Sequence, residues 1–403
     1  MVNPSTSSVS FLPADPGPAV WLREIHLESF RSYGRLSLTL DHGAVVLIGP
    51  NGAGKTNLLE AISLLSPGRG LRRAQAMQLP RWQAGGQVED HSRSWSVSAR
   101  IETPDGPVKA GTGVLPRAEG ENPRRVVRID GEYASQMALA ERFAISWLTP
   151  DMDAVLGAAP SERRRFLDRL VIAFDPAHAG RLQRYDKAAR QRNRLLEEGA
   201  KDSHWYDALE AQMAESGVAI IAARQALVSA LDVEAAQPLP SFPSARLKLE
   251  GLAEKWLETM PAVDVEDMIR RKANAARLRG ERSLPGPSGS LLTVTHSGTG
   301  QTAELSSTGE QKALVISVVL AHARLQARRL QRPPLLLLDD IASHLDAERR
   351  ASLYDLTSEL AGQVWFSGTD QDAFQPMPGR AQFVFLDNHG ATRPAARDMR
   401  SVS

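Results

Sequence analysis

The sequence predicts an α/β fold in which a block of helices is inserted between two halves of one domain. Two short apolar runs, 45–48 and 335–338, have the length and composition of buried strands. The first leads into a glycine-rich loop and a helical pattern, and the second ends in two aspartates. Between them, from residue 150 to about 280, the pattern becomes helical. Two strand-rich segments separated by helices favour one α/β domain with an insertion.

The first half of this domain is expected over residues 21–148 and is mainly strands. Apolar and polar residues alternate from Leu36 to Leu40, as in a half-buried strand. Segments 95–101 and 126–129 read as further strands, and Asp130-Gly131 marks a turn. Residues 1–20, rich in Ser and Pro, are expected to be a disordered lead-in.

The inserted block is expected over residues 149–284 as a mainly helical arm domain. It contains one apolar stripe at helical spacing, formed by Leu209, Met213, Ile220, Leu227 and Leu231. A Pro-Gly-rich loop over 285–289 ends the block. The second half of the α/β domain is expected over 285–390, with a strand at 291–295 and a helix around 314–320, followed by a tail over 391–403.

Bulk composition narrows the class of protein. The chain has 403 residues, 48 Lys and Arg, 47 Asp and Glu, and a net charge of +1. Any nucleic-acid contact must therefore come from a local basic patch. The sequence has no cysteine, which excludes disulfides and thiolate metal sites, and it shows neither a signal peptide nor an apolar run long enough for a bilayer. We expect a soluble, cytoplasmic protein with no membrane partner.

The glycine-rich loop has the pattern of a phosphate-binding loop. Residues 49–56 read GPNGAGKT between a predicted strand and a predicted helix. Glycines let backbone N–H groups surround phosphate oxygens, and the helix N-terminus favours an anion. We expect ATP at this loop, with Lys55 at the β- and γ-phosphates and the Thr56 hydroxyl as a ligand of Mg²⁺. The nucleotide-binding residues predicted here are Gly49, Pro50, Asn51, Gly52, Ala53, Gly54, Lys55 and Thr56.

Two carboxylates are expected beside this loop. Asp339 and Asp340 follow the apolar run 335–338, and in an open α/β sheet ligands bind at the carboxyl ends of the strands. We expect Asp339 to hold Mg²⁺ and Asp340 to orient or deprotonate the attacking water. Asp340 and Lys55 are the two catalytic residues predicted. Taken alone, such a pair is more often a strand end entering a turn.

A second anion-binding motif precedes the acidic strand. Residues 305–311 read LSSTGEQ and open a predicted helix, where Ser307 and Gly309 would face a phosphate. In isolation this segment could be a simple helix N-cap. The order of phosphate loop, signature and acidic strand resembles ABC-type ATPases. That resemblance implies a dimer in which the signature of one subunit caps the γ-phosphate held by the other.

The segment 343–346 resembles the D-loop of the same ATPases. The resemblance implies that Asp346 lies near the nucleotide, whereas His344 belongs to a connector and is given no catalytic role.

Longer phrases resemble the RecF family of DNA-repair ATPases. They are FRSYGRLSLTL (30–40), GPNGAGKTNLLEAISLLSPGRGLR (49–72), LTPDMDAVLGAAPSERRRFLDRL (148–170), STGEQKALVISVVLAHARL (307–325) and LLLLDDIASHLDAERR (335–350). The resemblance implies an ABC-type ATPase head with an inserted helical arm, ATP-dependent dimerisation on DNA, and work with RecR and RecO. It also implies roles in recombination, replication-fork maintenance and the SOS response.

The sequence departs from these families in three places. The family's Gly-Pro-His-Arg is Gly-Pro-Ser-Gly at 286–289, with Ser288 and Gly289 in place of His and Arg. No Gln stands at 148–150 for a Q-loop, and no switch His is found at 367–370. Asp340, where many ABC-type ATPases carry the longer Glu, and the missing switch His together predict a slow ATPase that acts as a timer. The expected activity is a weak, DNA-stimulated ATPase.

Basic residues gather in the helical block. Ten Lys and Arg lie between Arg163 and Arg194, and Lys187, Arg190 and Arg194 share one helix face. We expect these three to bind DNA phosphates without reading sequence. A second cluster comprises Arg270, Arg271, Lys272, Arg277, Arg279 and Arg282. The alternative is a solvated charged face.

Two other functions remain open at this point. The ATPase subunit of a membrane transporter would show a Q-loop, a switch His and a much shorter distance between phosphate loop and signature. An SMC-like structural ATPase would need long heptad arms, and no such repeat is present.

Overall fold

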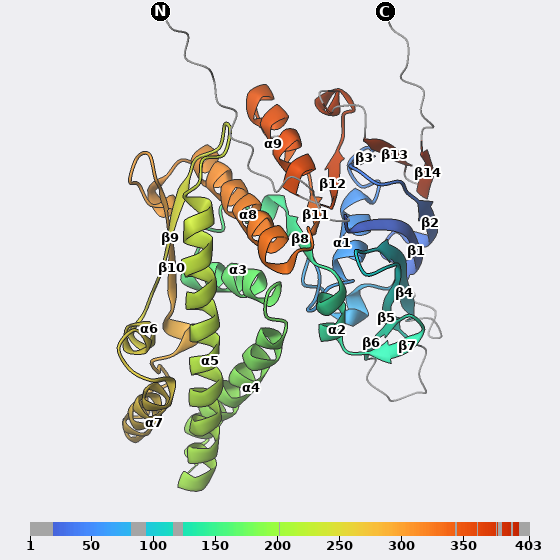
Figure 1. Cartoon of the computed structure of the whole chain (residues 1–403). Helices are drawn as coiled ribbons and strands as arrows, with labels where there is room; N and C mark the ends of the chain where they lie inside the picture. The colour runs from blue at the N-terminus through green and yellow to red at the C-terminus, as the bar shows by residue number, and fades with distance from the viewer. Residues whose placement is uncertain are drawn as a thin grey trace, which may run out of the picture.

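The computed structural model describes residues 19–81, 94–115, 124–200, 202–342, 345–360, 362–375, 377, 381–387 and 390–394. Two six-stranded sheets and a layer of helices form a head, and helices project from it as an arm (Figure 1). The predicted lead-in and tail lie almost wholly outside the described residues.

A largely parallel sheet forms the centre of the head. Its order is β14-β13-β3-β12-β11-β8, and all neighbouring strands are parallel except β13 and β14. The buried strands read as continuous apolar runs because helices cover them. The buried strand predicted at 335–338 is confirmed as β11, which pairs parallel with β12. The strands are β3 (Val45–Ile48), β8 (Ile145–Leu148), β11 (Leu335–Leu338), β12 (Gln363–Gly368), β13 (Gln382–Asp387) and β14 (Gly390–Pro394).

An antiparallel sheet of order β2-β1-β4-β5-β6-β7 lies beside it. The alternation at Leu36 and Leu38 places both side chains in the core, and Asp130 and Gly131 form the predicted turn with positive φ. The strands are β1 (Trp21–Phe30), β2 (Tyr33–Thr39), β4 (Trp95–Glu102), β5 (Val108–Val114), β6 (Arg125–Ile129) and β7 (Glu132–Ala134).

Helices of the head flank the parallel sheet. They are α1 (Lys55–Ser63), α2 (Gln136–Arg142), α8 (Thr308–Leu330) and α9 (Ala347–Leu360), together with short 3₁₀ turns. Helix α8 runs along the head beside β8 and α9 (Figure 1). Its buried residues from Ala313 to Leu325 belong to the main hydrophobic core.

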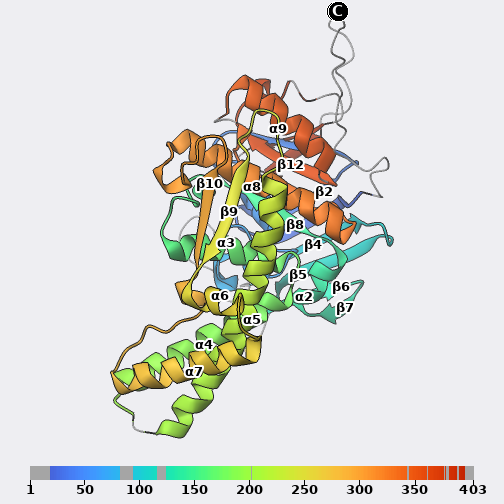
Figure 2. The ribbon, with the colours of Figure 1, turned by 60° about the vertical axis from the view of Figure 1, so that its left-hand side comes forward.

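The arm is built around one long helix. Helix α5 packs against α4, α7, α8 and β9, and its lower part extends away from the head with α4 and α7 (Figure 2). The elements are α3 (Pro160–Ile172), α4 (Ala177–Glu197), α5 (Ser203–Ala235), α6 (Leu252–Leu257), α7 (Ala262–Leu278), β9 (Ala245–Glu250) and β10 (Leu291–His296).

The predicted apolar stripe is buried along α5, but it serves two cores. Leu209, Met213 and Ile220 pack against α4, whereas Leu227 and Leu231 join the core of the head. The arm is therefore rooted in the head by the C-terminal part of α5.

Strand β9 was not expected inside the helical block. It pairs antiparallel with β10, and its burial alternates along Ala245–Glu250. The period-two signal was present in the apolar residues Ala245, Leu247 and Leu249, but it is short and follows a long helix.

Helix α5 is long and apolar enough to span a membrane by length and composition alone. Half of its most apolar window is buried inside the structure, and long core helices meet the same criterion. Its contacts with four other elements account for this composition.

A buried polar network joins α5 to the start of the second half-domain. Arg224 donates to both carboxylate oxygens of Asp168 at 2.7 and 2.8 Å, and to the Pro287 carbonyl at 2.6 Å. His178 contacts the same carboxylate at 2.8 Å. Burial raises the pKa of Asp168, but hydrogen bonds from His178 and Arg224 bring it below its ordinary value. The segment that departs from the family's Gly-Pro-His-Arg is thus held from α5.

Candidate nucleotide-binding site

The phosphate loop connects β3 to α1 as the sequence predicts. Gly52 and Gly54 have φ of 86° and 96°, a region in which a Cβ is strained. Gly54 is the N-cap of α1, with no side-chain cap and no acidic residue in the first turn. The N–H groups and positive dipole end of α1 are therefore available to an anion.

Lys55 closes the loop from inside. Its ammonium donates to the carbonyls of Gly49 and, at 2.9 Å, Pro50. Burial lowers the pKa of Lys55, and the nearby Asp340 and Asp339 oppose that shift. A phosphate could replace these carbonyl acceptors and give Lys55 a charged partner.

The acidic strand meets the phosphate loop across β12. Asp339 Oδ1 accepts hydrogen bonds from the Thr56 hydroxyl at 3.1 Å and the Ser367 hydroxyl at 2.7 Å. Ser367 Oγ also accepts from the Asp340 N–H at 2.9 Å. Because β12 lies between β3 and β11, Ser367 at its end joins the two segments. The predicted pair Thr56 and Asp339 is thus brought together.

Asp340 has an unusual backbone conformation. Its φ is 51°, in the left-handed region that non-glycine residues rarely adopt. The conformation turns the chain out of β11 immediately after Asp339. Asp340 is near enough to Lys55 to influence its pKa, so the two predicted catalytic residues share one site.

Sequence reasoning missed several residues that support the loop. The Tyr33 hydroxyl donates to the Gly54 carbonyl at 3.0 Å, and burial raises its pKa. Arg31 binds both oxygens of the fully buried Glu60 of α1 at 2.9 and 2.8 Å. Nothing in the local pattern marks them, because their partners lie in other segments.

A second set of contacts orders the first turn of α1. Asn57 donates to the Ser32 hydroxyl at 2.9 Å and accepts from Arg72 at 2.7 Å. Arg72 therefore brings a partly exposed positive charge close to the phosphate loop.

The signature lies at the exposed N-terminus of α8. The Ser307 hydroxyl caps the helix, and the Glu310 carboxylate accepts from the Ser307 N–H at 2.8 Å and hydroxyl at 2.9 Å. Gly309 is exposed, and a Cβ added there would meet nothing within 4 Å. No interaction within the described residues joins Ser307 or Gly309 to the phosphate loop of the same chain.

The start of α8 is anchored to the segment after β8. Lys312 is buried and donates to Asp153 at 2.9 Å, and Gln311 donates to the Ser306 carbonyl at 3.1 Å. These contacts fix where the signature points.

Asp346 caps α9. Its carboxylate accepts from the Arg349 N–H at 2.8 Å, and its side chain is largely exposed. Ser343 and His344 of the expected D-loop lie outside the described residues.

The three predicted DNA-binding residues lie exposed on α4. Lys187 and Arg190 form no ion pair with any described residue, and Arg194 pairs with Glu198 at 2.7 Å. Other members of the first basic cluster are buried instead: Arg163 pairs with Glu304 and Arg192 with Glu210.

The second basic cluster is largely neutralised by acidic neighbours. Arg270 pairs with Asp267, Arg277 with Asp207, Arg279 with Glu281 and Arg282 with Glu197. A phosphate backbone would compete with those carboxylates, which weakens the second cluster as a binding surface.

Comparisons with known proteins cover nearly the whole chain. Residues 21–389 match the family model "RecF/RecN/SMC N terminal domain". The chain is 47% identical over 379 residues to the DNA replication and repair protein RecF of Mesorhizobium japonicum, covering 93% of this chain and 97% of that relative. It is 45% identical over 370 residues to RecF of Brucella suis, covering 90% of this chain and 94% of that relative.

Solved structures share the fold at lower identity. The recombination mediator protein RecF of the RecFOR pathway aligns with a TM-score of 0.80 at 21% identity, covering 94% of this chain and 99% of that chain. A structure of RecF with ATP aligns with a TM-score of 0.77 at 21% sequence identity, covering 93% of this chain and 98% of that chain. An Smc head bound to the C-winged helix domain of ScpA aligns with a TM-score of 0.52 at 16% sequence identity, covering 92% of this chain and 97% of that chain.

Proposed function

We infer that this chain, which belongs to the RecF family, is an ATPase of DNA replication and repair that closes on DNA as an ATP-dependent homodimer. The observation that carries this inference is the division of the ATP site. One chain holds the phosphate loop beside Asp339 and Asp340, while its signature at Ser307 and Gly309 faces solvent. A second copy can supply the missing cap.

The phosphate loop is the ATP-binding element of each head. Residues Gly49–Thr56 offer backbone N–H groups and the Lys55 ammonium to the phosphates. ATP bound there would draw Lys55 away from its own loop carbonyls.

The residues present fit a magnesium ion. Thr56 and Asp339 place a hydroxyl and a carboxylate in contact, both oxygen donors of the kind that Mg²⁺ prefers. Two protein ligands suffice when nucleotide phosphates and water complete the shell. When bound, Mg²⁺ would neutralise charge that develops on the phosphates.

Asp340 is the proposed catalytic carboxylate. It follows Asp339 at the end of β11, close enough to Lys55 to oppose the lowering of the Lys55 pKa by burial. We infer that it orients or deprotonates water for attack, and that its short side chain keeps hydrolysis slow. Hydrolysis then limits the lifetime of the dimer on DNA.

The dimer is expected to place each signature opposite the partner's phosphate loop. Ser307 and Gly309 would meet the γ-phosphate, and Asp346 would lie near it from the D-loop. Each ATP is then bound by residues of both chains, which makes the dimer depend on ATP.

DNA is proposed to contact the exposed face of α4 at Lys187, Arg190 and Arg194. Lys187 and Arg190 form no ion pair with a described residue, which favours a phosphate ligand. In the cytoplasm the bound protein would cooperate with RecR and RecO in recombination, fork maintenance and SOS induction. The DNA-repair relatives span over 90% of the chain and do not favour the transporter or structural alternatives.

A gel-shift assay with and without ATP tests this function. ATP should strengthen binding to gapped DNA. Changing Lys187, Arg190 and Arg194 together to Ala should weaken it and reduce the slope of log affinity against log salt by roughly 2 to 3. The matched control is Lys109→Ala on β5. DNA binding by the parent that does not depend on ATP would contradict the proposed ATP-dependent dimer on DNA. An unaltered salt slope in the triple variant would mean that the α4 face is only a solvated charged surface.

A further inference from the structure

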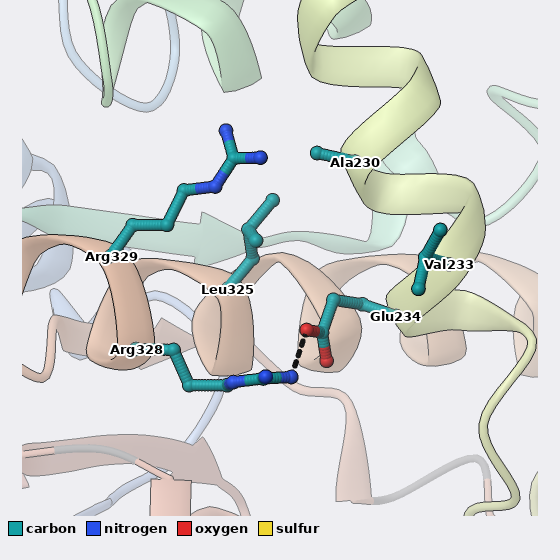
Figure 3. Close-up of a pocket in the computed structure, with 6 residues that line it drawn as sticks. All are labelled: Ala230, Val233, Glu234, Leu325, Arg328 and Arg329. Atoms are coloured by element: carbon teal, nitrogen blue, oxygen red, sulfur yellow. Dashed lines mark hydrogen bonds and ion pairs between the residues drawn. The ribbon is translucent and has the colours of Figure 1, made fainter.

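A groove lies outside the ATP site, between the C-terminal parts of α5 and α8. It encloses about 330 Å³ and is open to solvent (Figure 3). None of its residues belongs to the phosphate loop, the signature or the basic face of α4. Its lining consists of Ala230, Val233 and Glu234 from α5 and Leu325, Arg328 and Arg329 from α8.

The floor of the groove is apolar. Ala230 and Val233 of α5 face Leu325 of α8 across it (Figure 3). Val233 is 61% exposed, whereas Leu325 is buried. An aliphatic side chain of a ligand placed on this floor would cover Val233. Its own apolar surface and that of Val233 would then both be removed from water.

The two arginines of α8 are placed differently. Arg328 crosses the groove and pairs with Glu234, and Arg329 points away from that pair toward Ala230 (Figure 3). Within the described residues Arg329 forms no ion pair or hydrogen bond. Its guanidinium is therefore available to an anion at the edge of the apolar floor.

Glu234 adds a second unsatisfied group. The residue is 4% exposed, and its Oε2 atom has no hydrogen-bond partner within the described part of the chain. Because that oxygen is shielded from solvent, a ligand in the groove cannot reach it, and on the groove side the Glu234 charge is compensated by Arg328.

We propose that this groove binds a short acidic and aliphatic segment of a partner protein. One aliphatic side chain of the segment packs on the exposed Val233, and a carboxylate of the segment binds Arg329. The surface is separate from the ATP-dependent dimer proposed above, so either proposal can fail without the other.

The apolar floor favours a peptide over a phosphate backbone. Arg329 attracts a carboxylate and a phosphate alike, so the choice between them depends on Val233. A sugar–phosphate chain offers no aliphatic group to cover Val233. An acidic peptide offers both a carboxylate for Arg329 and an apolar side chain for Val233.

Fluorescence anisotropy on the full-length protein tests the proposal. The probe is a fluorescein-labelled peptide of alternating Asp and Leu, and the comparison peptides alternate Lys and Leu, or Asp and Ser. We expect the Asp-Leu peptide to bind more tightly than either. Equal binding of the Asp-Ser peptide, or no binding, would overturn the role of the apolar floor.

Variants of Arg329 assign the site. Arg329→Ala should weaken the Asp-Leu peptide by roughly three- to tenfold. Arg329→Glu should reverse the preference toward the Lys-Leu peptide. Arg35→Ala, which removes an exposed arginine on β2, is the matched control and should leave binding unchanged. An equal loss in the Arg329 and Arg35 variants would show nonspecific charge attraction and overturn the proposal.

Two further measurements separate other occupants. Inorganic phosphate or a single-stranded oligonucleotide that displaces the peptide at equal charge concentration would identify a phosphate site instead. Sedimentation without peptide tests whether the groove binds a second copy of the chain. If the parent associates and the Val233→Asp variant does not, the groove is a self-interface instead. For a peptide groove we expect that neither phosphate nor the oligonucleotide displaces the peptide, and that the parent is monomeric without peptide. The Arg329 variants should also behave as described above.

Discussion

Two helix N-termini in the head, those of α1 and α8, are both suited to phosphate, yet their local chemistry differs. Helix α1 begins at Gly54 with no side-chain cap and no acid in its first turn. Helix α8 begins at Ser307 with a complete capping box and Glu310 in its first turn. The first leaves its N–H groups for a ligand, whereas in the second the N–H groups of Ser307 and Glu310 already have side-chain acceptors.

The difference indicates how an ATP site can be divided between two chains. An exposed helix end that is never occupied by a ligand is stabilised by its own cap. Hydrogen bonds from the Ser307 N–H and hydroxyl lower the pKa of Glu310, so this carboxylate remains charged at neutral pH. In the proposed dimer the γ-phosphate would have to replace Glu310 as the acceptor of the hydrogen bonds from Ser307. Breaking those bonds costs free energy, which opposes dimer formation.

The largest expected effect is on hydrolysis at the α1 side of the site. Asp340→Asn should slow single-turnover hydrolysis by roughly 100-fold or more, because a general base contributes about that factor. The parent itself should turn over below about 10 per second. The variant should also prolong the ATP-bound dimer.

Asp355→Asn on exposed α9 is the control for this change and should behave like the parent. Equal rates of ATP hydrolysis in Asp340→Asn and the parent would mean that Asp340 only ends the strand.

ATP affinity at α1 should depend on Lys55. Lys55→Met should weaken ATP binding by roughly 10- to 100-fold and abolish ATP-driven dimerisation while the fold persists. Calorimetry measures the affinity, and circular dichroism checks the fold. Lys109→Met on β5 is the matched lysine control. Unchanged calorimetric affinity in the Lys55 variant would refute this assignment of the site.

The α8 side should respond in the opposite way. Ser307→Arg should leave ATP binding by the monomer intact and raise the protein concentration for dimerisation by roughly tenfold or more, since a bulky cation would occupy the contact. Sedimentation with ATP makes the measurement, and Ser358→Arg on α9 is the control. A normal ATP-dependent dimer would show that the signature is only a helix cap.

The smallest effect should come from Glu310. Glu310→Gln keeps the geometry of the capping box but removes the charge that faces the incoming phosphate. We expect dimerisation at ATP concentrations lower by roughly twofold, measured by titration in sedimentation experiments. A shift toward higher ATP concentration would mean that Glu310 helps closure rather than opposing it.

The phosphate loop could be predicted from the sequence because all its parts are contiguous. Strand, glycines, Lys55 and helix lie within a dozen or so positions, and their geometry follows from backbone rules. The acidic strand was predictable for the same reason, since four leucines that end in two aspartates describe a strand and its tip.

The arm and its charges were less predictable. Helical periodicity correctly indicated the buried face of α5, but it could not show that this face divides between two cores. The charge run from Arg163 to Arg194 looked like one surface, yet the structure buries Arg163 and Arg192 against Glu304 and Glu210. Their carboxylate partners are distant in sequence or on another helix.

The sequence by itself determined the α/β class, the phosphate loop and the acidic tip, because short-range backbone geometry and strand patterning specify them. Only the tertiary structure decided that Thr56 and Ser367 both donate to Asp339, and that Arg329 faces an apolar groove. Such contacts depend on which strands become neighbours and which helix faces meet, and those choices are made by packing over the whole chain.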